Sequence, residues 1–292
     1  MSLDLLPLLE PARPGDPALD YCLWPYEAPI LPAPGALRSS ALLFQSFAQA
    51  GLSSRALALT DAIRAAAGPF RTVWGVKWAE GRMSWEFYFY DYSRIHRRFG
   101  TRAFIEATKA HFAVDAPPAD DRPFFMFSVE VDAPVIETGR PVEQIDFYIG
   151  NPGSTVSSGI CYGQSRRGLE MRNFYFFFDA HQHAQEIREK LVSNAHVPWP
   201  RLRLEEILWP EMDARTIVVA NKRHNDGLYF SRVGVDGLVL FLDRLRFPDS
   251  VRAFVGDNRD RFAHLLFDVG YDYLPDEGGG LRLLKGSYYG LL

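Results

Sequence analysis

The sequence predicts a single α/β (α+β) domain, a ten-stranded antiparallel β-barrel of repeated hairpins surrounded by helices. Five hairpin-like units follow one another along the chain, and segments with helical periodicity separate most of them. Each second strand carries a tyrosine, and each first strand carries a small residue. Side chains along these strands alternate between an apolar face and a face with tyrosine, acids, lysine and glycine.

The composition excludes several classes of protein. The chain has 292 residues, of which 47% are hydrophobic, so it is long enough to bury a sizeable core. A net charge of −4 argues against a nucleic-acid partner, because such proteins are basic. No run approaches the ~20 apolar residues of a membrane span, and the first residues lack a signal-peptide pattern. Two cysteines, Cys22 and Cys161, cannot form a disulfide framework, which indicates a reducing, cytoplasmic location.

Residues 1–36 predict an irregular arm, because eight of them are prolines. Residues 37–292 are predicted to form one barrel domain without a second domain. Within it, residues 41–67 have helical periodicity with an interruption near Gly51, and Gly68-Pro69 ends the helical stretch.

The hairpins then follow in order. They are predicted at 72–92, 124–151, 156–179, 217–233 and 266–290. Helical patterns are predicted at 93–111, 180–194, 235–246 and 248–262. The connection between the second and third hairpins is too short for a helix.

Strand alternation divides the aromatic residues between two faces. In the strand 84–92, Trp85, Phe87 and Phe89 share one face, whereas Glu86 and Tyr88 lie on the other. The same division recurs around Phe147 and Phe176. Helices are expected to cover the apolar face, so the second face lines a closed barrel or contacts water in a twisted open sheet. Its tyrosines and glycines favour a barrel interior, because a solvent face is richer in Lys, Thr and Glu.

A chain of five hairpins separated by helices resembles the ABBA-type prenyltransferases, also called PT-barrels. Within that family it is most similar to the enzymes that prenylate cyanobactin peptides. The resemblance covers roughly residues 40–292 in pattern, and its best short matches are ANKRHNDGLYFSRV (220–233) and LRLLKGSYYGLL (281–292). Such enzymes ionise an allylic diphosphate, and an electron-rich acceptor attacks the allyl cation.

The resemblance implies a role for each set of interior residues. Tyrosines, one for each hairpin, would shield the carbocation through their aromatic faces: Tyr88, Tyr148, Tyr175, Tyr229 and Tyr289. Cations would bind the diphosphate: Lys77, Lys222, Lys285 and Arg172. Glu130 or Glu86 would act as the base that orients the acceptor.

The expected interior departs from the family in its charge. Glu86 stands where peptide-prenylating relatives carry an arginine, and the second hairpin offers Asp146 rather than a cation. One explanation is assistance by Mg2+, which favours one or two carboxylates together with substrate phosphates; Asp132 and Asp146 are the candidate ligands. Another is a different ligand, such as a cationic one.

Two further motifs have simpler structural explanations. Asp179, His181, His183 and Glu186 have an apparent metal spacing, but residues two apart on a helix do not share a face, and Asp179 suits a helix N-cap. Cys161 lies within a strand without a nearby histidine in the sequence, which favours a small packing residue over a nucleophile.

The sequence therefore predicts a prenyltransferase. It would move a dimethylallyl, geranyl or farnesyl group from its diphosphate to an aromatic small molecule or a peptide side chain. Two alternatives remain open: a ligand-binding barrel of unknown activity with an acidic, tyrosine-lined chamber, and an interaction protein that uses a tyrosine-rich face of an open sheet.

Overall fold

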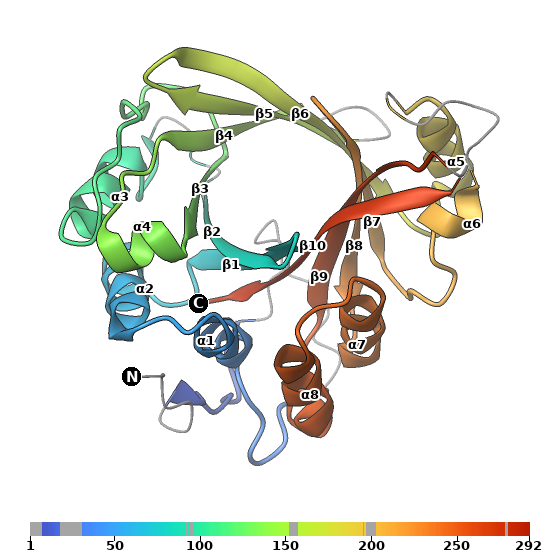
Figure 1. The fold of residues 1–292 in the computed structure, drawn as a ribbon, viewed down its shortest axis with the longest axis horizontal. Coiled ribbons are helices and arrows are strands. Elements are labelled where there is room, and N and C mark those ends of the chain that lie inside the picture. Colours follow the sequence, from blue (N-terminus) through green and yellow to red (C-terminus); the bar gives the residue numbers. More distant parts are fainter. Residues whose placement is uncertain are drawn as a thin grey trace.

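The computed structural model describes residues 8–17, 31–91, 93, 96–151, 157–194, 196, 203–277 and 280–292. Its centre is a closed barrel of ten antiparallel strands, with helices on the outside (Figure 1). The predicted fold class is confirmed, and the alternative of an open sheet is wrong because the first strand pairs with the last.

All five predicted hairpins are present. The strands are β1 Thr72–Ala79, β2 Arg82–Tyr90, β3 Met126–Asp132, β4 Gln144–Asn151, β5 Ser157–Ser165, β6 Gly168–Asp179, β7 Thr216–Lys222, β8 Asp226–Val233, β9 Phe267–Pro275 and β10 Leu281–Leu291. Each strand pairs with its neighbours along the chain, and β1 pairs with β10 from Val73↔Leu291 to Ala79↔Lys285. This register fixes which side chains of every strand face the lumen, because their direction alternates with each residue.

The described helices are α1 Ser40–Gln49, α2 Ser54–Ala67, α3 Thr101–Thr108, α4 Ala133–Thr138, α5 Ala184–Val192, α6 Leu204–Ile207, α7 Val235–Arg244, α8 Asp249–Asp257 and α9 Arg259–Phe262. Most of them lie between hairpins, whereas α1 and α2 precede the first hairpin and α4 lies inside the second, between β3 and β4. The predicted interruption between α1 and α2 is confirmed, and Gly68 ends α2 with a positive φ of 93°. None of the described helices is long and apolar enough to cross a membrane.

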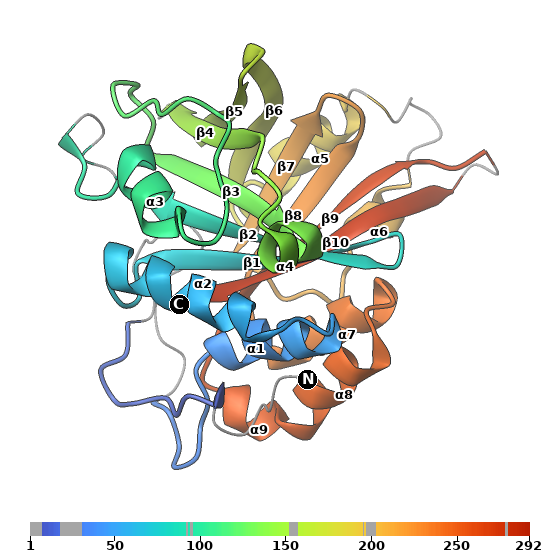
Figure 2. The ribbon, with the colours of Figure 1, turned by 60° about the vertical axis from the view of Figure 1, so that its left-hand side comes forward.

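The apolar strand face forms the main core beneath these helices, as predicted. Helices α1 and α2 lie over β1, α4 over β3, and α7 over β8 and β9 (Figure 2). Trp85 of β2 is fully buried, meets Phe47 of α1 edge-on at 5.2 Å, and donates its indole N–H to Ser46 Oγ at 2.8 Å. Burying such a side chain contributes about 1.5–3 kcal/mol, so the outer layer supplies much of the stability.

Three helices differ from the prediction, and one of them is the four-residue α6, which was not predicted. The pattern over 93–111 predicts a longer helix than α3, which begins at Thr101 because the Asp120 carboxylate accepts the N–H groups of Thr101 and Arg102. The short helix α4 was not predicted. Asp132 caps its first turn by accepting the Val135 N–H at 3.0 Å.

The described part of the N-terminal arm is bound to the first two helices. Glu10 accepts hydrogen bonds from Ser40 Oγ and Arg64 Nη1, both at 2.7 Å, and Asp16 pairs with Arg38 at 2.8 Å. Residues 1–7 and 18–30 of the predicted arm, including Cys22, lie outside the described residues.

Candidate functional site

Five tyrosines form a closed belt across the lumen, and each comes from a different hairpin. These are the five tyrosines that the sequence placed on the inner face. The centroids of neighbouring rings are 5.9–6.4 Å apart around the whole belt. These separations fall within the range of favourable aromatic pairs. The members of this tyrosine belt are Tyr88, Tyr148, Tyr175, Tyr229 and Tyr289. The belt confirms that the tyrosines were correctly assigned to the inner face.

Small residues on adjacent strands make room for the belt. Gly270 pairs with Tyr229, and a Cβ added at Gly270 would lie 2.1 Å from the Tyr229 ring. Gly75 pairs with Tyr289, where an added Cβ would lie 2.7 Å from that ring. Each of these two tyrosine rings therefore lies over the glycine backbone of the neighbouring hairpin.

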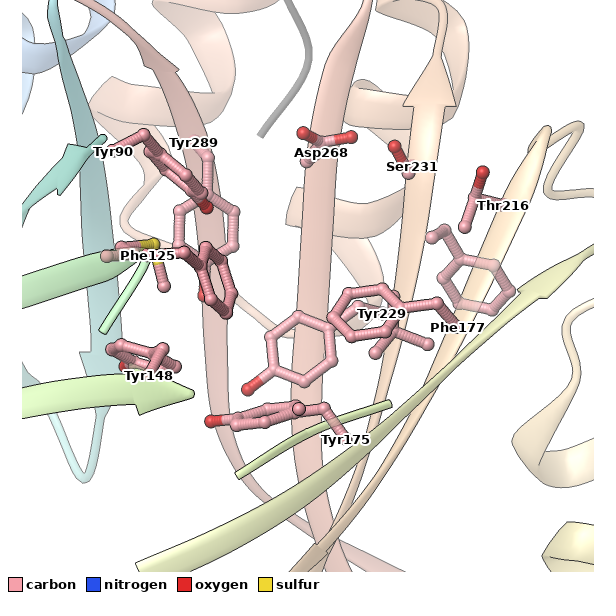
Figure 3. Close-up of a pocket in the computed structure, with 14 residues that line it drawn as sticks. Tyr90, Phe125, Tyr148, Tyr175, Phe177, Thr216, Tyr229, Ser231, Asp268 and Tyr289 are labelled. Carbon is pink, nitrogen blue, oxygen red and sulfur yellow. The ribbon is translucent and has the colours of Figure 1, made fainter. Parts of the chain in front are cut away.

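On one side of the belt the lumen is apolar. A cavity of about 60 Å³ is lined by Tyr90, Phe125, Met126, Phe177 and Val218 together with four belt tyrosines. Figure 3 shows Tyr148, Tyr175 and Tyr229 near one another, with Asp268, Ser231 and Thr216 along the upper edge of the view. This half lies at the end of the barrel where the hairpins connect to the helices.

On the other side, toward the hairpin turns, the lumen is charged. A cavity of about 230 Å³ adjoins the same four belt tyrosines and Tyr88. We call it the polar chamber. Its charged lining residues are Lys77, Glu86, Glu130, Asp146, Arg172, Lys222, Arg223, Asp272 and Lys285. The structure thus brings together every predicted diphosphate ligand and both predicted bases.

The strands β1–β4 supply an acidic wall, which we define as Glu86, Glu130 and Asp146 with Lys77 among them. Glu86 and Glu130 are directly opposite each other across β2 and β3. The Lys77 ammonium pairs with Glu86 and, at 2.6 Å, with Glu130. Burial disfavours the charged form of Lys77, but Glu130 and Glu86 outweigh it and raise its pKa well above the ordinary value.

Glu86 is further held by hydroxyl groups. It accepts hydrogen bonds from Tyr88 Oη at 2.6 Å and from Ser128 Oγ. For Glu130, burial acts to raise the pKa, but Lys77 and Lys285 lower it to about 2. Glu130 is therefore a firmly ionised carboxylate and a weak base.

The strands β6–β10 supply a basic wall, which we define as Arg172, Lys222 and Lys285 with Asp272 among them. The Asp272 carboxylate pairs with Lys222 at 2.6 Å and with Lys285 at 3.1 Å. Burial opposes ionisation of Asp272, but these two ammonium groups hold its pKa well below the usual range. Lys222 also donates to Tyr229 Oη at 2.9 Å, which connects this wall to the tyrosine belt.

A glutamine joins the two walls. Gln144 donates to Asp146 Oδ1 at 2.5 Å and accepts from Arg172 Nη1 at 3.2 Å. Its side chain lies against Gly163, where an added Cβ would approach it to 2.8 Å. In the described part of the chain, neither Asp146 nor Arg172 has an ion-pair partner within 4 Å. Burial, followed by the charge of Glu86, raises the pKa of Asp146 to about 7.

Asp146 has a property that the sequence did not reveal. A proton acceptor works best when its pKa is close to the operating pH. Alternation placed Asp146 inside the barrel, but its proton affinity depends on burial and on Glu86, which is 60 residues away in the sequence. From the sequence, Asp146 is a candidate metal ligand, and nothing there indicates its raised pKa.

The predicted magnesium ligands do not converge. Asp132 caps α4 and pairs with Arg140 at 2.6 Å, so its carboxylate is bound outside the polar chamber. Asp146, in contrast, lines the polar chamber. Within the described ranges, no three His, Cys, Asp or Glu residues are grouped so that they could hold a metal ion. Asp132 and Asp146 therefore do not form a shared magnesium site.

The two remaining motifs have structural roles. Asp179 Oδ1 accepts the N–H groups of His181 and Gln182 at 3.0 and 2.9 Å, and His183 Nδ1 accepts the Asp179 N–H. Cys161 is fully buried beside the belt, and burial raises the pKa of its thiol. A thiol held in this neutral form is a poor nucleophile.

Comparison with known proteins adds no identification. No protein-family model matches the chain, and no curated protein is detectably similar to it. Its function is therefore argued from the geometry and charge of the lumen.

The belt generates a stability prediction. Gly270→Ala places a methyl group where the Tyr229 ring lies, so we expect a loss of about 1–3 kcal/mol in the free energy of unfolding. Gly159→Ala is the matched control, because its Cβ would meet only ordinary contacts at 3.6 and 3.8 Å. Urea denaturation of both variants measures the difference. Equal stabilities would contradict the close packing at Gly270.

A second prediction concerns Asp146. Its carboxyl should be neutral below and ionised above a pH of about 7, as followed by the carboxyl carbon chemical shift in NMR. Glu86→Gln removes a neighbouring negative charge, so the Asp146 pKa should fall. Glu106→Gln, on the exposed pair with Lys109 away from the chamber, should leave it unchanged. An Asp146 titration near pH 4 in the wild type would contradict the burial of this group.

Proposed function

We propose that the protein is a prenyltransferase that moves an allylic group from its diphosphate to an acceptor bound in the barrel. The observation that carries the proposal is the division of one lumen into a charged half and an apolar half at the tyrosine belt. An allylic diphosphate has the same polarity: an anionic head, a reactive carbon beside it, and an apolar tail.

The basic wall suits the diphosphate head. Lys222 and Lys285 share a single carboxylate, Asp272, so they retain excess positive charge. Arg172 adds a guanidinium group, which can bind phosphate oxygens in a bidentate manner. Lys77 contributes less to diphosphate binding than the sequence suggested, because its charge is already paired with two carboxylates.

The tyrosine belt suits the developing allyl cation. A cation within ~6 Å of an aromatic centroid is attracted by the ring quadrupole, and the attraction grows when water is excluded. The burial of Tyr229 and Tyr289 raises the pKa of both hydroxyl groups, so the rings stay neutral phenols. Neutral phenols are poor competitors with the acceptor as nucleophiles.

Asp146 is the proposed proton acceptor. It lines the polar chamber next to Tyr148 and forms no ion pair with the described residues, whereas Glu86 and Glu130 both pair with Lys77. A carboxylate with a pKa of about 7 can take the proton that the acceptor loses when its bond to the allyl group forms.

The apolar cavity favours a short tail. Its volume of about 60 Å³ is well below the ~150 Å³ of an engineered cavity that admits benzene. Dimethylallyl diphosphate therefore fits with the least side-chain movement, whereas geranyl and farnesyl tails require the belt or Phe177 to shift.

A second candidate is a ligand-binding barrel without transferase activity. The acidic wall favours it, because a chamber evolved for diphosphate alone gains nothing from three carboxyl groups opposite the cations. Such a barrel would hold a cationic or polyhydroxylated molecule.

Thermal unfolding with dimethylallyl, geranyl and farnesyl diphosphate, each with and without Mg2+, tests the proposal. A ligand at 100 times its Kd adds about 2.7 kcal/mol of stability, so we expect Tm to rise by about 5 °C or more. The largest rise is expected for the dimethylallyl compound. Mass spectrometry should then detect one added dimethylallyl group on a bound acceptor.

Lys222→Met tests the head-group assignment. Loss of a charged hydrogen-bond donor should weaken dimethylallyl diphosphate about tenfold or more. Lys109→Met makes the same change on the exposed end of α3 and should leave the affinity unchanged. The absence of a Tm shift with all three diphosphates would contradict the transferase and leave the second candidate.

A further inference from the structure

The two walls of the polar chamber are unbalanced in opposite directions. On the acidic wall, Glu86 and Glu130 share the ammonium of Lys77, and the nearby carboxyl group of Asp146 has no cation paired with it among the described residues. On the basic wall, Lys222 and Lys285 share the carboxylate of Asp272, and the guanidinium of Arg172 contacts the uncharged Gln144. A single anionic ligand satisfies the basic wall and leaves the acidic wall short of positive charge.

The acidic wall needs a cation for a physical reason. Glu86 and Glu130 are a directly opposed cross-strand pair, and like charges in that position repel. Lys77 neutralises one of them. Asp146 then adds a third carboxyl group, on the same face of the neighbouring strand β4, opposite Ser128. A second cation entering the chamber would relieve this repulsion.

Aromatic faces next to the wall also suit a cation. Tyr88 and Tyr148 line the polar chamber beside Glu86 and Asp146, with their ring centroids 6.4 Å apart. A guanidinium group matches this combination, because it is planar, stacks on aromatic rings and binds carboxylates through paired N–H donors.

We propose that the acceptor of the reaction carries a guanidinium group, which binds to Glu130 and Asp146 of the acidic wall while the diphosphate occupies the basic wall. The inference rests on the proposed function for its diphosphate partner and adds the class of acceptor to it. A neutral phenol or indole acceptor would leave the repulsion between the carboxylates unrelieved.

The transfer step balances with these groups. The bond between the allylic carbon and the diphosphate oxygen breaks, and its electron pair leaves with the diphosphate. The Asp146 carboxylate takes one proton from a guanidinium nitrogen as the electron pair of that nitrogen forms the new C–N bond to the allylic carbon. The product remains a guanidinium, and no oxidant or reductant is needed.

A divalent metal ion fits this wall less well. Mg2+ requires a near-octahedral set of oxygens at 2.0–2.1 Å. Glu86 already accepts hydrogen bonds from Tyr88 and Ser128 and pairs with Lys77, so its oxygens are oriented by these donors.

The first test compares two probes of the same shape by titration calorimetry on the full chain. Nα-acetyl-arginine amide should bind at least tenfold more tightly than Nα-acetyl-citrulline amide, which has no charge. Nα-acetyl-lysine amide separates recognition of a guanidinium from that of any cation and should bind more weakly than the arginine probe. Equal affinities for the arginine and citrulline probes would overturn the proposal without requiring any variant.

Two variants localise the site. Glu130→Gln and Asp146→Asn preserve side-chain shape and should each weaken the arginine probe about tenfold, while inorganic diphosphate binds as in the wild type. Glu106→Gln removes an equivalent charge from an exposed pair on α3, away from the chamber, and should change neither affinity. If MgCl2 alone binds, and the same two variants abolish that binding while the arginine probe is unaffected, the wall is a metal site and the proposal is wrong.

The calorimetry is run with and without inorganic diphosphate, which separates the two hypotheses. Selective binding of the arginine probe without any binding of diphosphate would contradict the transferase and retain the cation site. Binding of diphosphate without discrimination between arginine and citrulline would contradict the guanidinium acceptor and retain the transferase.

Discussion

Pairing between β1 and β10 is the constraint on which the rest of the molecule depends. Without this pairing, the ten strands would form an open sheet with two free edges, and each of its two faces would contact either helices or water. Closure by the seven residue pairs from Val73↔Leu291 to Ala79↔Lys285 turns one face into an enclosed lumen. The charges deepest on that face, Lys77, Glu86, Lys222 and Asp272, then lose most of their water, so each needs a partner within the barrel or in a ligand.

The ion pairs of the polar chamber are a consequence of this enclosure. Buried ion pairs commonly contribute little net stability, because desolvation offsets their attraction. The outer face demonstrates that this chain can bury apolar strand residues efficiently, as around Trp85. Charges kept on the inner face are therefore better explained by a ligand than by stability. The tyrosine belt supports the same explanation, since it separates these charges from an apolar cavity.

The parts of the fold that depend on local patterns could be predicted from the sequence. The alternation of Phe87 and Tyr88 is a property of neighbouring residues, and it correctly placed the belt inside. The start of α4 also had a local signal, Asp132 followed by Pro134, but the helix is six residues long and gives no periodicity. At α3, periodicity predicted a longer helix. The start of the actual helix is set by Asp120, which lies 19 residues after Thr101 and gives no local signal.

The partners of the interior charges could not be predicted in the same way. Lys77 meets Glu130 across 53 residues of sequence, and Lys222 meets Asp272 across 50. Alternation identifies the side of the sheet on which a charge lies but gives neither its neighbours nor their number. The separation into an acidic wall on β1–β4 and a basic wall on β6–β10 arises from the order of strands around the closed barrel. Four carboxyl groups and five cations line this chamber and are separated into two poles, and a ligand pair of opposite charges matches it better than one anion does.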